Sequence, residues 1–121
     1  MENMFKGANI KNLNMSNLDF SSNNNVTNMF DYANISNINL NGVHGLKDAS
    51  WMFTRITTGS LDLTKFDFSQ TENIGVMFYY AKIGRLDMSN LDLSNVTNVG
   101  TMMDGSEVDY ADFSGVHGLT N

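Results

Sequence analysis

The sequence contains no cysteine and no proline, and it has few basic residues. Without cysteine the chain forms no disulfide, offers no thiolate ligand to a metal and has no cysteine nucleophile. Without proline, and with abundant Asn, Ser and Gly, it fits neither a proline-rich linker nor a helical bundle, because these small polar residues compete with the backbone bonds of a helix. We therefore expect an ordered chain that is rich in turns.

Positive charge and long apolar runs are also scarce. The 121 residues include 13 acidic and 7 basic side chains, for a formal net charge of -6. This charge repels phosphate backbones and anionic lipid head groups, so we expect no nucleic acid partner. No apolar run approaches the roughly 20 residues of a spanning helix, and the start MENMFKGANI lacks the layout of a signal peptide. We expect no direct insertion into a membrane.

An internal repeat organises the whole sequence. The pair Met-Phe recurs at almost constant spacing, and a Met-Met pair continues the same register. These pairs begin at Met4, Met29, Met52, Met77 and Met102. The repeat predicts a single solenoid domain of five rows, 4–28, 29–51, 52–76, 77–101 and 102–121. Because neither end carries an atypical capping row, we expect a fragment of a longer array, with end-to-end self-association as one consequence.

Each row carries the frame I-x-x-L-x-L-x-x-L. The central L-x-L alternation is typical of a strand with one buried face, so we expect one short parallel strand per row of about 25 residues. The apolar residue at its second Leu should stack from row to row in the interior. This column comprises Met15, Leu40, Leu63, Met88 and Phe113. Before each Met-Phe pair, as in VTNVGTMM (96–103), apolar residues at three- and four-residue spacings favour one helical or 3₁₀ turn.

The frame, together with the phrases LDMSNLDLSNVTNVGTMM and LNMSNLDFSSNNNVTNMF, resembles the BspA-like leucine-rich repeats of bacterial surface proteins. The match is closest in period to the 25-residue type of mycoplasma lipoproteins and lactobacillus cell-surface proteins. This resemblance implies a leucine-rich-repeat-like solenoid that is exposed on the cell surface and takes part in adhesion to host proteins or mucus. An alternative parse in fives, as in ANIKN LNMSN LDFSS, resembles the right-handed β-helix of pentapeptide-repeat proteins, whose four-sided coils have a shorter turn.

One outward column of the expected strands is acidic in its last three rows. It contains Asn14, Asn39, Asp62, Asp87 and Asp112. Oxygen ligands suit Ca²⁺, so the three carboxylates are weak metal candidates, but we favour a solvated face and expect no cofactor. Stacked carboxylates should also repel one another, which predicts a protein that is more stable near pH 5 than near pH 7.5. The repeated D-x-S/T phrase that begins in this column favours side chains that bond the backbone at turns.

A second column combines tyrosine with arginine. Three residues after each first Met, it reads Gly7, Tyr32, Arg55, Tyr80 and Gly105. Tyrosine and arginine are enriched in binding hot spots, and an arginine between two tyrosine rings can make cation–π contacts. The column is therefore a candidate recognition strip, which Tyr79 and Trp51 would widen. Arg85 and Tyr110 form a second candidate strip beside the acidic row. The alternative is that these side chains only pack over a bend.

Two histidines occur in identical GVHGL contexts, in a column otherwise occupied by aspartate. His44 should therefore lie beside Asp19 and Asp67 in the neighbouring rows, and His117 beside Asp92. Such pairs could serve as an acid–base couple or a metal site, but no nucleophile, third ligand or pocket-forming insertion accompanies them. We favour a turn variant or a pH-sensitive contact and expect that the protein is not an enzyme.

Two functions are compatible with these observations. The first is a non-catalytic adhesion module that recognises a host protein, mucin or glycan. The second is a passive spacer that holds another domain away from a cell wall. The tyrosines in outward columns favour binding, because a spacer has no need of them. Extracellular or cell-surface location follows from the resemblance alone.

Overall fold

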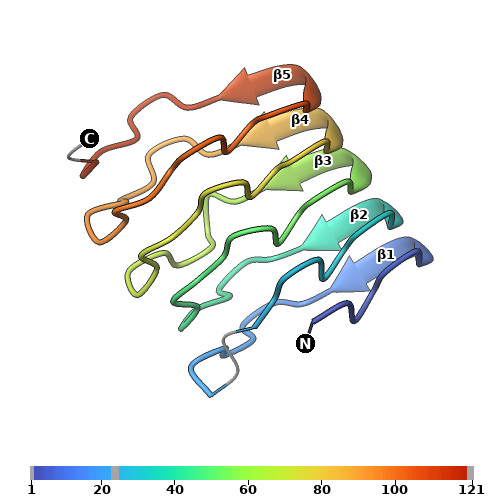
Figure 1. Ribbon diagram of the computed structural model, residues 1–121, viewed down its shortest axis with the longest axis horizontal. Coiled ribbons are helices and arrows are strands. Elements are labelled where there is room, and N and C mark those ends of the chain that lie inside the picture. The colour runs from blue at the N-terminus through green and yellow to red at the C-terminus, as the bar shows by residue number, and fades with distance from the viewer. Residues whose placement is uncertain (1, 23–24, 120–121) are drawn as a thin grey trace.

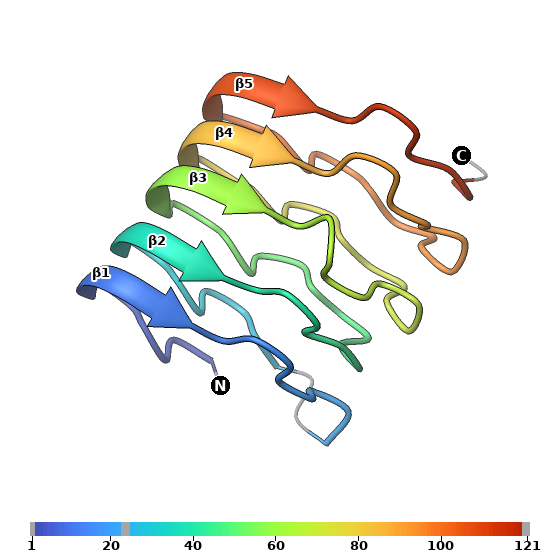
Figure 2. The ribbon, with the colours of Figure 1, turned by 180° about the vertical axis from the view of Figure 1, so that it is seen from behind.

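The computed structural model describes residues 2–22 and 25–119, which form a β-solenoid (Figure 1). Its strands are β1 (Asn9–Asn14), β2 (Asn34–Asn39), β3 (Thr57–Asp62), β4 (Lys82–Asp87) and β5 (Glu107–Asp112). They pair in parallel in the order β1-β2-β3-β4-β5, and Figure 2 shows them side by side from behind. The prediction of one short parallel strand per row is thereby confirmed. No helix that could cross a membrane occurs in the described ranges.

The register also decides between the two sequence parses. Asn12 pairs with Asn37, and Lys82 pairs with Glu107, so neighbouring strands are offset by one full row of the Met-Phe repeat. This offset is longer than one turn of a four-sided pentapeptide coil. The alternative parse in fives is therefore set aside.

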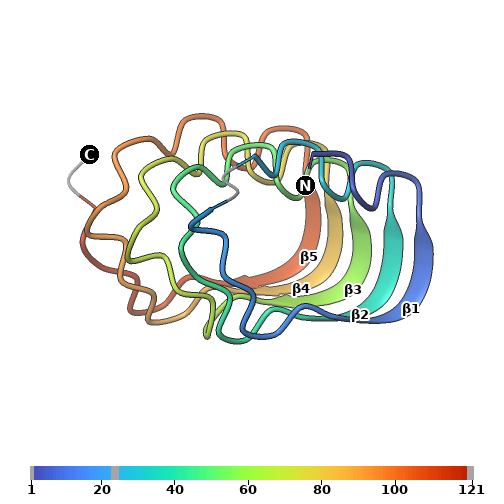
Figure 3. The ribbon, with the colours of Figure 1, turned by 90° about the horizontal axis from the view of Figure 1, so that it is seen from below.

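Each strand begins earlier than the L-x-L alternation predicted. In β4 the inward residues are Ile83 and Leu86, three positions apart, and the strand ends one residue before buried Met88. Figure 3 shows that every strand curves around the inside of the solenoid, and in β4 the two residues between the inward pair are less buried than that pair. The pairing still reaches Met88, whose N–H donates to the Asp112 carbonyl. The alternation therefore marks the end of the strand instead of its centre.

The core consists of side-chain columns that run through the stacked rows. The rings of Phe5, Phe30, Phe53 and Phe78 form a ladder with centroid separations of 5.5, 5.4 and 5.8 Å. In the predicted interior column, Met15, Leu40, Leu63 and Met88 are all buried. Phe113, the fifth member, is 40% exposed, and among the described residues only the fourth row packs against it. Stacking, and not the row alone, thus provides the burial.

The helical or 3₁₀ turn predicted before each Met-Phe pair is wrong. In the fourth row the N–H groups of Met77 and Tyr79 donate to carbonyl oxygens three residues earlier, as in β-turns. The N–H groups of Val76 and Phe78 instead donate to carbonyl oxygens in the next turn of the solenoid. Because every second N–H is used between rows, the segment cannot continue the internal ladder of a helix. It forms consecutive turns that the sequence periodicity could not distinguish from a helix.

The D-x-S/T phrases have the structural role that the sequence favoured. The Oδ1 atom of Asp67 accepts a hydrogen bond of 2.8 Å from the Ser69 N–H, and Asp48 accepts one of 2.9 Å from the Ser50 N–H. The same Asx turn recurs in several columns around the solenoid. These short local bonds satisfy backbone groups at the bends.

Candidate functional site on the turn face

The consecutive turns before the strands form one side of the solenoid, which we call the turn face. It comprises residues 3–7, 28–32, 51–55, 76–80 and 101–105. In each segment the first and the last residue have a positive φ, between 50° and 70°. A type II turn requires this conformation at its third residue, where glycine and asparagine are the usual occupants. The turn face therefore has two columns in which most side chains are disfavoured.

The last of these two columns is the predicted recognition strip. Its end rows carry glycine, whereas its middle rows carry Tyr32, Arg55 and Tyr80 with φ values of 59°, 54° and 52°. A left-handed conformation costs a non-glycine residue roughly 1–2 kcal/mol. The first column carries Trp51 and Val76 in the third and fourth rows and Thr101 in the fifth, and a β-branched residue is a genuine outlier at such a φ. Bulky side chains thus occupy the middle of the turn face at a cost in backbone energy.

Arg55 is held by three hydrogen bonds. Its Nε and Nη2 atoms donate to the two carboxylate oxygens of Asp31 at 2.7 and 2.8 Å, and its Nη1 donates to the Tyr32 hydroxyl at 3.0 Å. The guanidinium carbon lies 4.4 Å from the centroid of the Tyr32 ring. The Asp31 side chain is 2% exposed, and its hydrogen bonds raise the pKa of Arg55. The predicted cation–π contact is confirmed at Tyr32, and its geometry is fixed by a carboxylate.

Sequence reasoning missed Asp31. It occupies a different column from Arg55 and lies 24 residues before it, so a comparison within columns could not find the pair. Charge could have indicated the pair. Asp31 stands one column before the strip in the second row, and Arg55 stands in the strip in the third row.

Tyr80 does not join the Arg55 clamp. Its ring packs edge-on against Tyr79 with a centroid separation of 4.6 Å, and Tyr79 meets Trp51 in the same way at 5.5 Å. Tyr32, Tyr80 and Trp51 are 62%, 54% and 38% exposed. The middle of the turn face therefore presents two neighbouring groups, a Tyr32–Arg55 stack and a Trp51–Tyr79–Tyr80 run.

The second candidate strip lies elsewhere, on the outer face of the sheet. Arg85 of β4 and Tyr110 of β5 are register partners, and the Arg85 guanidinium carbon lies 4.5 Å from the Tyr110 ring centroid. The candidate residues therefore divide into a larger set on the turn face and one pair on the sheet.

The acidic row has the predicted register. Asp87 pairs with Asp62 on one side and with Asp112 on the other. Each accepts a bond from the N–H two residues later, and no group of three or more metal-ligating side chains occurs in the part of the chain that the structure describes. Hydrogen bonds from Ser114 lower the pKa of Asp112, and Arg85 adds to the shift. The pKa of Asp112 is therefore shifted in the direction opposite to the one that a repelling row of carboxylates predicts.

Each histidine lies beside the predicted aspartate of the preceding row, and no contact of His44 with Asp67 is found among the described residues. His44 Nε2 is 3.8 Å from Asp19 Oδ1, and His117 Nε2 is 3.9 Å from Asp92 Oδ1. In each case Nδ1 lies 2.9–3.0 Å from a glycine carbonyl two residues earlier. Because a carbonyl only accepts, Nδ1 carries the proton and Nε2 faces the carboxylate. Hydrogen bonds within the Asx turns, chiefly, lower the pKa values of Asp19 and Asp92.

Comparison with known proteins identifies a family. The family model described as "Mycoplasma protein of unknown function, DUF285" matches residues 1–114. No curated protein and no solved structure matches the chain.

Proposed function

The chain belongs to the Mycoplasma family that matches residues 1–114, and we propose that it is a non-catalytic bacterial cell-surface module that binds a host extracellular protein, mucin or glycan. The BspA-like wording of the repeats supports the surface location and the adhesive role. The turn face is the contact surface in this proposal, with Tyr32, Arg55, Tyr79, Tyr80 and Trp51 as its principal groups.

The observation that carries the proposal is the combination of strain with exposure. Tyr32 and Tyr80 adopt positive φ values although glycine occupies the same column in the end rows, and both rings are more than half exposed. Strained backbone persists where surrounding structure holds it, and it gathers at functional sites. Exposed tyrosine supplies a large contact area and loses little conformational entropy on binding. A surface with only a structural role would be served by glycine here, as in the end rows.

The Arg55 clamp supports the same proposal. A side chain already held by Asp31 and Tyr32 is preorganised, so a ligand that stacks on it does not have to order it. The competing function is a passive spacer. One observation favours the spacer: three N–H donors of Arg55 already bond within the protein and are not available to a ligand.

A binding screen separates the two functions. The chain is applied to an array of glycans and extracellular matrix proteins, and each ligand found is tested again with the double variant Tyr32→Gly/Tyr80→Gly. This variant removes both exposed rings, restores the residue favoured by the turns and retains the Asp31–Arg55 pair. We expect binding to weaken by at least roughly tenfold, as for hot-spot residues, with an unchanged circular dichroism spectrum.

The matched control is Tyr110→Ala, which removes an exposed tyrosine from the sheet. It should bind as the unchanged protein does. If Tyr110→Ala alone weakens binding, the contact surface is the sheet pair of Arg85 and Tyr110. If the array gives no ligand, the spacer is favoured.

A further inference from the structure

The solenoid has two open edges, one on the first row and one on the fifth. β1 and β5 lie at opposite ends of the sheet, and each pairs with one strand among the described residues (Figure 1). Apolar side chains are exposed at both edges. Met4 and Leu18 of the first row are 56% and 39% exposed, and Phe113 of the fifth row is 40% exposed. Each edge therefore presents part of the core columns to solvent.

The backbone groups at the two edges are complementary. The Tyr80 N–H donates to the Asp104 carbonyl at 2.9 Å and so joins the fourth row to the fifth. Gly105 has the position of Tyr80 in the fifth row, and its N–H donates to no described residue. At the other edge Lys6 has the position of Asp104, and its carbonyl accepts from no described residue. A first row stacked on a fifth row brings this free donor to this free acceptor.

Opposite charges occupy one column at the two edges. Lys11 of β1 and Asp109 of β5 both stand seven residues after the first Met of their rows, and both are exposed. The intervening rows have only small uncharged residues in this column, namely Ser36, Gly59 and Gly84. Neither Lys11 nor Asp109 forms an ion pair with a described residue. The column thus has one free cation at one edge and one free anion at the other.

A second pair of opposite charges lies on the turn face. Lys6 and Asp104 both stand two residues after the first Met of their rows, and neither has an ion pair with a described residue. The fifth row as a whole contains four acidic residues and no lysine or arginine, whereas the first row contains two lysines and one aspartate. Contact between two fifth rows would oppose like charges, and contact between a fifth and a first row pairs opposite ones.

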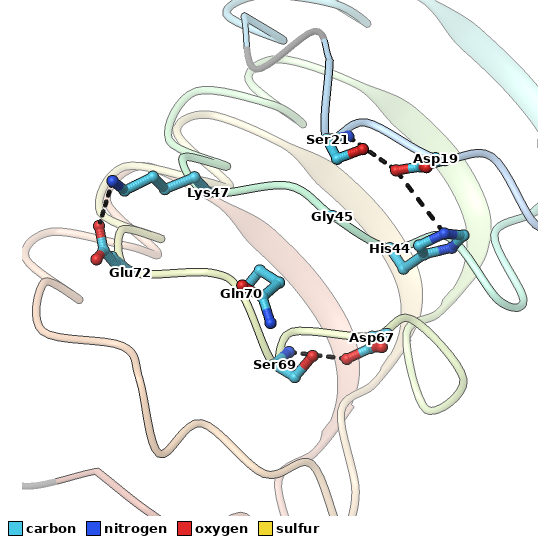
Figure 4. Close-up of a pocket in the computed structure, with 9 residues that line it drawn as sticks. All are labelled: Asp19, Ser21, His44, Gly45, Lys47, Asp67, Ser69, Gln70 and Glu72. Atoms are coloured by element: carbon cyan, nitrogen blue, oxygen red, sulfur yellow. Dashed lines mark hydrogen bonds and ion pairs between the residues drawn. The ribbon is translucent and has the colours of Figure 1, made fainter.

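The second row shows how a histidine of this repeat is flanked when a further row follows it. His44 lies 3.8 Å from Asp19 of the first row, and Asp67 of the third row lines the same cavity of about 590 Å³ from the other side (Figure 4). His117 repeats the contact with Asp92 at 3.9 Å, but no described residue takes the place of Asp67. Asp19 stands in the same column, so a first row stacked on the fifth supplies the missing aspartate.

We propose that the open edge of the fifth row binds the first row of a second copy of this chain, head to tail and in register. In this joint Lys11 of one copy stands beside Asp109 of the other at the spacing of neighbouring strands, about 4.8 Å. Lys6 stands beside Asp104 in the same way. Because the two edges differ, the contact is heterologous and leaves one edge free at each end, so further copies add in the same manner. The turn faces of successive copies then lie on one side of the stack.

The joint is weaker than the contacts between rows of one chain. Each copy has a net charge of -6, which opposes association. Two copies also lose translational and rotational freedom when they bind, a cost that rows of one chain do not have. The apolar columns, the backbone bonds and the opposite charges at the joint offset these costs. We therefore expect a reversible stack that dissociates on dilution.

The test is sedimentation equilibrium of the full 121-residue chain from the micromolar to the millimolar range. We expect the weight-average mass to rise with concentration from the monomer mass of 13.5 kDa past that of a dimer, without a plateau. A constant monomer mass would overturn the proposal. A plateau at the dimer would also overturn it, because a closed dimer indicates contact between two like edges.

Two charge reversals locate the joint. Lys11→Glu and Asp109→Lys each place like charges side by side, so we expect each to raise the dissociation constant roughly tenfold. The two variants change the net charge in opposite directions, so net charge cannot explain a loss in both. The double variant Lys11→Glu/Asp109→Lys restores an opposite pair at every joint and should associate as the unchanged chain does.

The matched control is Lys65→Glu in the third row, where the side chain is exposed and belongs to neither edge. It changes the net charge as Lys11→Glu does and should leave the dissociation constant nearly unchanged. Equal weakening by Lys65→Glu and Lys11→Glu, or no recovery in the double variant, would place the contact elsewhere and overturn the proposal. Because these variants leave the tyrosines, Trp51 and Arg55 of the turn face unchanged, failure here leaves the adhesion proposal untouched.

Discussion

The middle rows and the end rows have apolar residues in the same columns, but these residues are buried to different extents. Leu63 is fully buried in the third row, whereas Phe113, in the same column of the fifth row, is 40% exposed. Phe66 is 2% exposed in the third row, whereas Leu18 is 39% exposed in the first. The residue types are equally apolar, so the difference comes from having a row on one side or on two. Stability in such a molecule is a sum over neighbouring rows.

The same contrast appears on the turn face. Glycine occupies the strained column in the end rows, and Tyr32, Arg55 and Tyr80 occupy it in the middle. In this column the bulky residues at positive φ are supported by contacts, since Arg55 bonds to Asp31 and Tyr32 in the preceding row and the Tyr80 ring packs on Tyr79. The middle rows are therefore the best packed, and they also carry the exposed side chains whose backbone conformation is unfavourable.

The largest expected effect concerns the core. Leu63→Ala should lower the free energy of unfolding by about 2–5 kcal/mol, as buried leucine truncations do. Phe113→Ala should cost about 1 kcal/mol or less, because a half-exposed ring loses less buried area. Urea unfolding measures both, with Ser94→Ala on the surface as a control that should change little. Similar losses for Leu63→Ala and Phe113→Ala would mean that the ends are covered in solution.

The second effect concerns the two arginine–tyrosine contacts. Arg55→Met leaves the buried carboxylate of Asp31 without its cation, so we expect a loss of about 2–3 kcal/mol, somewhat less than for a fully buried pair. Arg85→Met removes only an exposed cation–π contact and should cost below about 1 kcal/mol. The double variant Asp31→Asn/Arg55→Met should recover part of the loss in urea unfolding. If Arg55→Met costs no more than Arg85→Met, Asp31 is hydrated in solution.

These contrasts indicate what a sequence of this kind reveals. The columns, the parallel register and the neighbours of His44 follow from the period, because identical rows must stack in phase. The Asp31–Arg55 pair does not, since it crosses columns. The positive φ values of Tyr32 and Tyr80 were hidden because their residue types do not favour them. The second row is two residues shorter than its neighbours. The sequence did not reveal that a cavity lies at the shortened segment.

A third, smaller effect concerns backbone strain. Tyr80→Gly relieves a positive φ but loses the contact with Tyr79, so we expect a net change within about 1 kcal/mol. Gly105→Ala places a side chain at a φ of 69°, with its Cβ 2.7–2.8 Å from the Tyr80 ring. It should cost about 1–2 kcal/mol although it lies in an end row. A double-mutant cycle in urea should show positive coupling, because Tyr80→Gly removes the ring that the new methyl group meets. Additive effects would indicate that the ring moves away freely.

The smallest effect is that of acid on the exposed Asx turns. The folded pKa values of Asp19, Asp92 and Asp112 are lowered below 3.8, chiefly by hydrogen bonds from Ser21, Ser94 and Ser114. The unfolded chain therefore binds more protons near these values, so each group contributes stability that is fully present above the unfolded pKa. That contribution is lost as the pH falls through the folded pKa.

We expect the free energy of unfolding to fall between about pH 5 and about pH 3, and to fall less steeply in the double variant Ser94→Ala/Ser114→Ala, which removes the hydroxyl donors. Urea unfolding across this range, with chelator present, measures the slope. Stability that instead rises on acidification would restore the repulsion first expected for the acidic row, and would mean that Asp112 responds more to Asp87 beside it than to Ser114 two residues away. The test thereby asks whether local turns or stacking between rows govern the charges on an end row, where only one neighbour is present.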